Sequence, residues 1–519
     1  MPSRFLPHQL CPLMATKPPK GMRPCPATGG LIGSVDCGSK RNSELSCPAS
    51  CPFNPFGPAG YDLWLRLDGT WTPKAAEWVV KCVGANEFRE MLESCAGDEG
   101  LEEAFDHHFA FASAIHWYLG WYRGSDGLTL GEAWRKAGWP GLNNDERVMS
   151  EHRCRSFPTL LEVERPEDGQ SVWVRDLWAG PDSAAFLLVD RMAAKELVRF
   201  DLVISWVTRY PHFARFVGGG LHLSRDLLEA FEDEWRAFAR EELNLKRKPT
   251  ADQMRSVLAS DFDYAHELIA DLGADSRQAM LRNADLQVCS AFYRIAGPAP
   301  AVLDRIASCP EFEACESEAG EDLPESTAFT WLRRGESKRI EAKMPEAFQH
   351  PDDESLGVGI LGRISVGPKE VLVRTMSGQK HDFARERVAE IFGPLLEFVK
   401  ESRIDAAAQL ADCIDSGEDD ETETDDLPAE DIPPEVRAEV LRMAMEKHFA
   451  GLADAKLPIF GGRSAREAAR NPKLRPAVVS WAKGQWESAA RLGRRDGADI
   501  TDYPRRLAAE LGLDELKDG

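Results

Sequence analysis

Four cysteines lie within 27 residues near the beginning of this chain, with 11, 9 and 3 residues between successive ones. The intervening residues are rich in Gly, Pro, Ser and Asn, which favour turns over a packed core. Such a segment buries too little apolar surface to fold by itself, and a metal ion bound by four thiolates would supply the missing stabilisation. We therefore predict a zinc knuckle whose ligands are Cys25, Cys37, Cys47 and Cys51.

Two other interpretations of the four cysteines remain open. Cys47 and Cys51 have the close spacing of a zinc-binding pair, but the first gap is long and there is no second tight pair. The cysteines could instead be free thiols that happen to cluster. They could also form two disulfides or serve redox chemistry.

The chain carries no signature of a membrane or secreted protein. It has no run of 18 apolar residues, and its first residues lack the apolar core of a secretory signal because Arg4, Pro7 and His8 interrupt them. We expect a cytoplasmic protein that does not enter the membrane. Its twelve cysteines would then be mostly reduced, which favours a metal over disulfides.

The charge of the chain is strongly negative but unevenly distributed. A formal net charge of −23 argues against sequence-independent nucleic-acid binding by the whole surface. Residues 1–50, however, carry six basic and two acidic side chains. This basic knuckle could contact the phosphates of a nucleic acid, or its Lys and Arg side chains could simply offset the negative charge of the thiolates.

Length and pattern predict an α+β, multidomain chain with three or four folded domains. Residues 415–432 are dominated by Asp and Glu, which favours a solvated acidic linker. The expected divisions are a cysteine-rich zinc knuckle at 1–60, a helical segment at 61–150, a small β domain at 151–220, a helical segment at 221–310, an α+β segment at 311–414, the linker, and a helical C-terminal module at 433–519.

Two regions show the alternation of apolar and polar residues that is typical of strands. In the first, four short runs predict a small antiparallel sheet or barrel, and Gly218–Gly220 is expected to be a flexible turn after it. The four runs are Phe157–Glu164, Ser171–Trp178, Ala185–Asp190 and Phe200–Thr208. In the second, the pattern predicts strands at Leu356–Val366 and Lys369–Met376 and a helix at Ala384–Glu401.

Two catalytic or cofactor-binding motifs are suggested by the sequence, but neither is complete. His266 and Glu267 begin a zinc-protease pattern, but Ala270 stands where the second histidine is required. The glycines 357, 359 and 362 match a dinucleotide fingerprint but lead into a strand rather than a helix. If the chain is a hydrolase or another enzyme of the central α+β body, the first candidates are Asp106, His107, His108 and His116; otherwise the catalytic residues are unknown.

The C-terminal module has a distinctive turn followed by a helix start. Gly461 and Gly462 form the turn, and Ser464 and Glu467 have the spacing of a capping box, in which each side chain satisfies a backbone N–H. An ordinary helical hairpin would explain the same residues.

The pattern of Pro458, Gly461, Gly462, Glu467 and Ala468 resembles the toxin-binding C-terminal domain of Xre/MbcA/ParS-type antitoxins. Ala465 stands where that pattern has Pro. The chain also resembles uncharacterised bacterial proteins that join an N-terminal SEC-C-like cysteine motif to such a tail. The resemblance implies a protein toxin as partner and contacts through Gly461, Gly462, Arg463, Arg466 and Glu467.

These observations favour a zinc-stabilised binding or adaptor protein over an enzyme, because no nucleophile elbow, phosphate-binding loop or second metal cluster is evident in the sequence. We expect the knuckle and the C-terminal module each to dock a partner. A protein is the more plausible partner, and a nucleic acid bound by the basic knuckle is the second choice.

Overall fold

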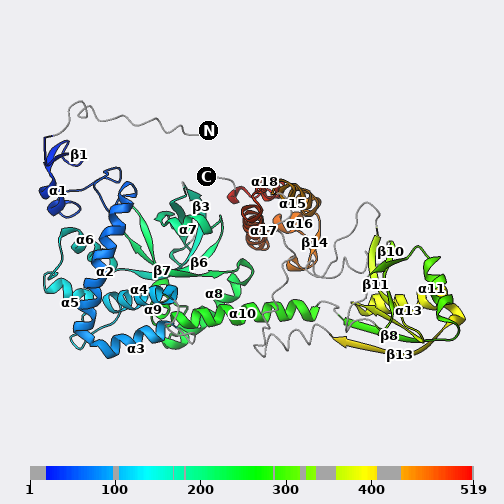
Figure 1. Cartoon of the computed structure of the whole chain (residues 1–519). Coiled ribbons are helices and arrows are strands. Elements are labelled where there is room, and N and C mark those ends of the chain that lie inside the picture. The colour runs from blue at the N-terminus through cyan, green and yellow to red at the C-terminus, as the bar shows by residue number, and fades with distance from the viewer. Residues whose placement is uncertain are drawn as a thin grey trace. The chain divides into compact units, whose positions relative to one another are not determined.

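The computed structural model describes residues 19–96, 104–167, 169–180, 183–283, 287–315, 323–334, 358–405 and 434–516. They belong to two compact units, one formed by residues 1–269 with 429–519 and the other by residues 270–428 (Figure 1). Helices and several separate sheets are both present, which confirms the α+β class. The acidic run at 415–432 lies outside the described residues.

The first unit begins with a hairpin and a bundle of helices. Strands β1 (Met22–Cys25) and β2 (Gly30–Gly33) pair antiparallel and lead into the short helix α1 (Ser34–Lys40). Five helices follow, as the sequence predicts for this segment. They are α2 (Tyr61–Val83), α3 (Ala85–Ala96), α4 (Ala104–Gly120), α5 (Leu130–Lys136) and α6 (Asn144–Arg153).

Aromatic rings and arginines alternate along the buried face of α2. The guanidinium of Arg153 lies 4.4 Å from the ring centroid of Trp71 and 5.4 Å from that of Trp64. On the other side of Trp64, the guanidinium of Arg215 lies 4.6 Å away and also faces Tyr61 at 5.1 Å. Cation–π contacts are strongest where water is excluded, so this stack ties α2 both to α6 and to the strand that carries Arg215.

Five strands close into a small barrel in the order β3-β4-β5-β7-β6. They are β3 (Phe157–Glu167), β4 (Ser171–Asp176), β5 (Phe186–Val189), β6 (Leu202–Arg209) and β7 (Ala214–Leu223), with helix α7 (Arg191–Glu196) after β5. Alternate side chains such as Leu161, Val163 and Val172 fill the interior. The predicted small β domain is therefore a closed barrel.

The expectation of a flexible turn at Gly218–Gly220 is wrong, because these residues lie within β7. A Cβ atom added to Gly220 would lie 2.7 Å from Cγ1 of Val203 on the neighbouring strand. Glycine is therefore needed there for close packing of the strands.

The remaining elements of the first unit are helices, apart from one two-residue strand pair. Helices α8 (Leu228–Glu242), α9 (Ala251–Ser260) and α10 (Phe262–Asn283) follow the barrel, and the division between the units falls within α10. The C-terminal module contains α15 (Pro434–Phe449), the strand pair β14 (Lys456–Leu457) and β15 (Arg463–Ser464), α16 (Ala465–Ala469), α17 (Arg475–Asp496) and α18 (Asp502–Glu510).

The second unit is a six-stranded antiparallel sheet in the order β13-β8-β12-β11-β10-β9. Helices α11 (Ala299–Ala307) and α13 (Gly378–Phe392) pack against it and share its core. The strands are β8 (Gln287–Ile295), β9 (Phe312–Cys315), β10 (Thr327–Arg334), β11 (Val358–Val366), β12 (Glu370–Thr375) and β13 (Leu396–Asp405).

Two expectations fail in this unit. The segment expected to be helical at 221–310 contains β8, which lies inside the sheet between β13 and β12. The helix expected to run to Glu401 ends at Phe392, because Gly393 has a φ of 48° and Pro394 follows it. The chain then continues as β13.

Among the helices of the described residues, none combines the length and the apolar character that a membrane span requires.

Candidate functional site

The four predicted zinc ligands are buried near one another. Cys25 ends β1, Cys37 lies in α1, and Cys47 and Cys51 lie in the loop that follows. Their exposed fractions are only 5 to 6%, and none of the four forms a disulfide. The disulfide interpretation therefore has no support in the structure.

The turn after Cys25 stabilises a thiolate at that position. Burial raises the pKa of the Cys25 thiol, but hydrogen bonds from the hydroxyl and backbone N–H of Thr28 and from the N–H of Ala27 outweigh it and leave the pKa below its ordinary value. The N–H groups of Thr28 and Gly29 also donate to the Cys25 carbonyl, which closes the turn. A thiolate that accepts N–H donors in a tight turn is suited to bind a metal ion.

The other thiols respond to one another's charge. Burial raises the pKa of Cys37, and negative charge on Cys51 and Cys25 raises it further, while Arg23 and Arg41 act in the opposite direction. Burial also raises the pKa of Cys47, with the same contribution from its cysteine neighbours. A divalent cation among these sulfurs would reverse this effect, because it stabilises every thiolate that it binds.

The sulfurs are neighbours but do not have the spacing of a closed metal site. Zinc binds each sulfur at about 2.3 Å in a tetrahedron, which places the four sulfurs within about 4 Å of one another. Among the residues that the structure describes, no three of the cysteine sulfurs lie within 4.8 Å of one another. Metal binding would therefore have to draw the sulfurs closer together.

The cysteine segment is fixed to the body of the first unit by polar contacts. The guanidinium of Arg41 binds the carboxylate of Asp145, at the beginning of α6, and the side-chain amide of Asn144 donates to the Arg41 carbonyl at 2.9 Å. On the barrel side, Nε2 of His212 donates to the carbonyl of Cys47 at 2.7 Å. The segment thus joins α6 to the connection between β6 and β7. No local sequence pattern indicates these contacts.

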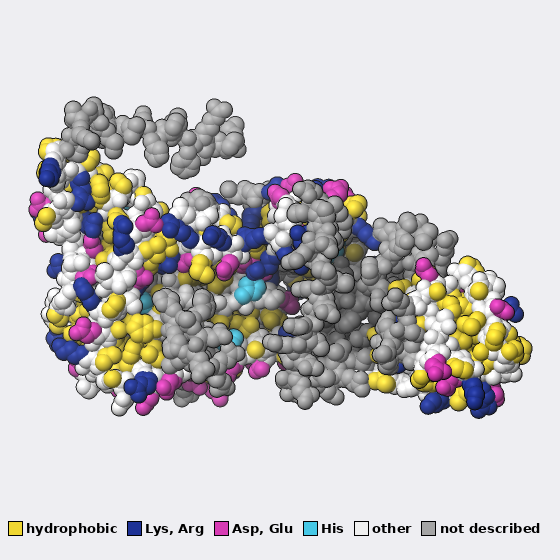
Figure 2. Space-filling model, viewed as in Figure 1, with side chains coloured by type: hydrophobic (Ala, Val, Ile, Leu, Met, Phe, Trp, Pro, Cys, Tyr) yellow, Lys and Arg dark blue, Asp and Glu magenta, His cyan; other side chains and the backbone are white. Residues whose placement is uncertain are grey.

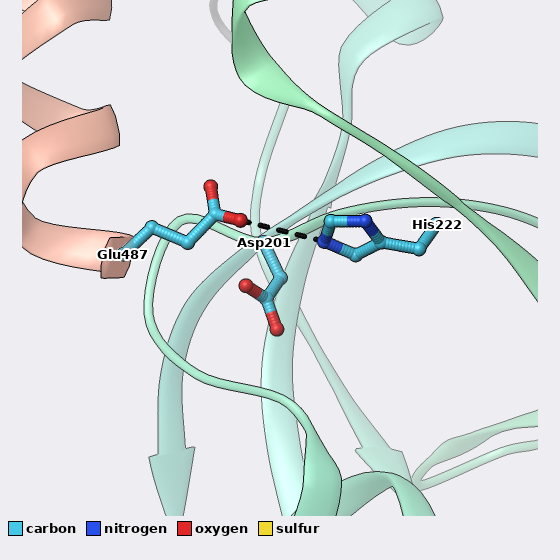
Figure 3. A group of neighbouring side chains, drawn as sticks. All are labelled: Asp201, His222 and Glu487. Atoms are coloured by element: carbon cyan, nitrogen blue, oxygen red, sulfur yellow. Dashed lines mark ion pairs between the residues drawn. The ribbon is translucent and has the colours of Figure 1, made fainter. Parts of the chain in front are cut away.

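A second cluster lies where the barrel meets the C-terminal module. Asp201 precedes β6, His222 lies on β7 and Glu487 on α17, and their potential ligand atoms lie within 4.8 Å of one another (Figure 3). Asp201 is fully buried, and burial raises the pKa of its carboxyl group. Sequence analysis does not identify this cluster, because its members come from three distant parts of the chain.

Arg491 already supplies the positive charge that these carboxylates attract. Its Nη2 atom lies 2.9 Å from Oδ1 of Asp201 and 2.7 Å from Nε2 of His222, and its Nε atom lies 3.5 Å from Oε1 of Glu487. A guanidinium can only donate, so Nε2 of His222 accepts in this contact, and the same Nε2 lies 3.4 Å from Oε1 of Glu487 (Figure 3). We therefore interpret the cluster as an ion-paired joint rather than an open metal site.

Further ion pairs extend this contact into the buried interface between the barrel and the C-terminal module. Glu162 on β3 binds Lys483 of α17 at 2.7 Å and Arg225 at 2.9 Å, and all three side chains are largely buried. Beside them, Phe200 is part of the core of the C-terminal module, and its ring lies edge-on to Trp486 at 5.7 Å. The C-terminal module is therefore packed on the barrel within one compact unit.

Two of the predicted partner contacts serve the fold of the C-terminal module itself. Arg466 pairs with Asp454 at 2.7 Å and with Glu510 at 3.3 Å. The side chain of Glu467 accepts from the N–H of Ser464, and the Ser464 hydroxyl accepts in return, so the predicted capping box is confirmed.

The other three predicted contacts lie at the surface. Gly461 and Gly462 have φ values of 65° and 75°, which favour glycine, and both are exposed, as is Arg463. The neighbouring Ile459 is 62% exposed. The turn Ile459–Arg463 therefore exposes an apolar side chain and a cation that are four residues apart, while Phe460 between them is buried.

Of the four residues proposed as enzyme candidates, only His116 has a described side chain. Asp106, His107 and His108 fall in α4, but their side chains lie outside the described residues. His116 is buried, and its Nδ1 donates to the carbonyl of Ala112 at 2.7 Å. Burial, together with the charge of Arg153, lowers the pKa of His116 to about 3.

Charges of both signs are mixed on the visible surface of the first unit. Figure 2 shows Lys and Arg side chains interspersed with Asp and Glu there, rather than a continuous basic stripe. Comparison with protein-family models, curated proteins and solved structures found no match for this chain.

Proposed function

We propose that this chain is a zinc-stabilised binding protein whose C-terminal module docks a protein partner. The observation that supports it most is the burial of four cysteine thiols in a segment that has only a short hairpin, a two-turn helix and loops. Thiols in such a segment have few apolar neighbours to pack against, so a bound ion is the simplest source of order.

The zinc would have a structural role. Cys25, Cys37, Cys47 and Cys51 would fill all four positions of the ion and leave none for a substrate. By relieving the repulsion between thiolates, the ion would order the segment that presents Arg41 to Asp145 and the Cys47 carbonyl to His212. Metal binding would thus stabilise the contact between the segment and the body of the first unit.

Elemental analysis of the purified full chain tests this role. We expect about one zinc per chain, and we expect the double variant Cys47→Ser, Cys51→Ser to lose it. The matched control is Cys82→Ser, Cys309→Ser, which removes two cysteines outside the cluster. If the control loses zinc as readily as the cluster variant, or if the wild-type chain binds none, the proposal is wrong.

The partner would bind at the exposed turn Ile459–Arg463. An apolar side chain beside a cation suits a protein surface that has an apolar pocket next to a carboxylate. The resemblance to Xre/MbcA/ParS-type antitoxins makes a toxin the first class of partner to test. A nucleic acid is less favoured, because Arg23 and Arg41 of the basic segment are engaged inside the protein with Phe53 and Asp145.

Cross-linking in the native cell tests the docking turn. Ile459→Asp should abolish the cross-linked complex, because it places a carboxylate at the centre of the apolar contact. Met443→Asp is the matched control, since Met443 lies in the same module and is 59% exposed, close to the value for Ile459. Equal loss with both variants, or retention with both, would contradict a role for this turn.

A further inference from the structure

Strand β13 forms an exposed edge of the sheet in the second unit (Figure 1). It is ten residues long, and every residue after Leu396 is exposed. Three large apolar side chains on it are open to solvent, since Phe398 is 42%, Val399 49% and Ile404 42% exposed. A long edge strand with apolar side chains readily pairs with another strand, and proteins usually shield such edges.

We propose that β13 pairs with β13 of a second copy of this chain. The two strands would run antiparallel about a two-fold axis at Ser402 and join the two six-stranded sheets into one continuous sheet. The face to which each side chain points, and the charges that each register brings together, select this arrangement.

The contacts of β13 fix its two faces. Glu401 and Arg403 point toward α13, where they pair with Arg385 at 2.7 Å and Asp382 at 2.5 Å. Lys400 points to the opposite face, and its Nζ atom lies 4.8 Å from the ring centroid of Phe292. From Lys400 to Asp405 the pairing with β8 is regular, so successive side chains of β13 point to opposite faces. Ile404 therefore points away from α13, as Lys400 does.

A two-fold axis through the sheet restricts the register. A two-fold axis perpendicular to the sheet leaves each face of the sheet on the same side, and residues directly opposite each other in an antiparallel pair point to the same face. The residue at the centre of the pairing must therefore lie opposite its own copy in the second chain. Axes at Lys400, Glu401 or Arg403 would each place a charge opposite itself. Among residues 400–403, only an axis at Ser402 avoids this repulsion. An axis at Ile404 also avoids it, but it lies one residue from the end of β13 and would pair far fewer residues of the strand.

The register centred on Ser402 is also complementary in charge. It places Glu401 opposite Arg403 of the second copy, and this pair occurs twice because of the symmetry. It places Lys400 opposite Ile404 of the second copy, so that the alkyl stem of lysine covers an exposed apolar side chain. This self-complementarity favours a second copy over an unrelated strand as the occupant of the edge.

Sedimentation velocity of the full chain tests the pairing. Because the interface is small, we expect the wild type to shift from the mass of one chain to that of two between about 1 and about 100 μM. Glu401→Arg alone and Arg403→Glu alone should each remain monomeric, because each brings like charges together across the axis. The matched control Arg305→Glu, an exposed position on α11, should associate like the wild type.

The decisive sample is an equimolar mixture of Glu401→Arg with Arg403→Glu. In the mixed pair, two arginines face two glutamates, so association should return to the wild-type level. Misfolding of either variant could not be repaired by mixing. Ile404→Lys tests the other face, since it would oppose Lys400 of the second copy and should also prevent association.

A wild type that stays monomeric throughout this range would overturn the proposal. So would single variants that associate as strongly as the wild type, or a mixture in which association does not return.

Discussion

Arg41 of the cysteine segment and Asp145 of α6 form a two-point ion pair. Nε of Arg41 lies 2.6 Å from Oδ1 of Asp145, and its Nη2 atom bonds to Oδ2. The side chains are only 17% and 12% exposed, so the pair is poorly screened by solvent. Two parallel bonds also fix the orientation of the segment on the helix, which a single bond could not do.

Replacing Arg41 should detach the cysteine segment from the helices. We expect Arg41→Ala to cost about 2 kcal/mol in free energy of unfolding, because it leaves the buried carboxylate of Asp145 without its cation. The measurement is hydrogen exchange, which should show faster exchange over residues 25–51 and little change in the barrel.

Arg41→Lys is the informative control for this pair. Lysine keeps the charge but cannot form two parallel bonds, so it should restore only part of the protection. Full restoration by lysine would show that charge alone matters and would contradict the two-point geometry.

Phe200 should stabilise the barrel and the C-terminal module together. Its ring lies in the core of the module although the residue belongs to the loop before β6. Phe200→Ala should therefore cost about 3 kcal/mol, and the loss should appear in both parts of the first unit. Urea unfolding followed by hydrogen exchange measures both quantities. Loss of protection in the module alone would mean that the module is a separable unit, as the sequence suggests.

His116 should make stability fall in mild acid. Burial lowers the pKa of His116 to about 3, from an ordinary value of 6.5, so the folded chain keeps this ring neutral where the unfolded chain binds a proton. The free energy of unfolding is therefore unaffected by this ring above about pH 6.5. It decreases as the pH falls from 6.5 toward 3, because only the unfolded chain binds the proton in that range. Between pH 7 and 5 the loss amounts to about 2 kcal/mol.

His116→Leu isolates this contribution. Urea unfolding of the wild type and the variant at pH 7 and pH 5 should show a smaller acid loss in the variant, by about 2 kcal/mol. Identical losses in the two proteins would show that His116 titrates normally in the folded state.

Features carried by neighbouring residues could be predicted from the sequence. The capping box of Ser464 and Glu467 depends on residues three apart, and the barrel strands depend on alternation within each run. The four cysteines lie within 27 residues of sequence, but the distances between their sulfurs depend on how the loops fold and were not predictable.

Features carried by distant residues were not predictable. Arg41 and Asp145 are 104 residues apart, and Glu162 and Lys483 are 321 residues apart. No local sequence pattern can predict either ion pair. Strand β7 was missed for a related reason. In the sequence alone Gly220 indicates a turn, and only its contact with Val203 on the neighbouring strand shows that glycine is needed there for close strand packing. The joint between the barrel and the C-terminal module depends entirely on such pairs.

Zinc-edge X-ray absorption of the purified full chain reports which atoms bind the ion, and so distinguishes a cysteine site from any other. A zinc ion held by Cys25, Cys37, Cys47 and Cys51 should show four sulfur ligands at about 2.3 Å. A shell of nitrogen and oxygen ligands, such as Asp201, His222 and Glu487 would provide, would contradict it.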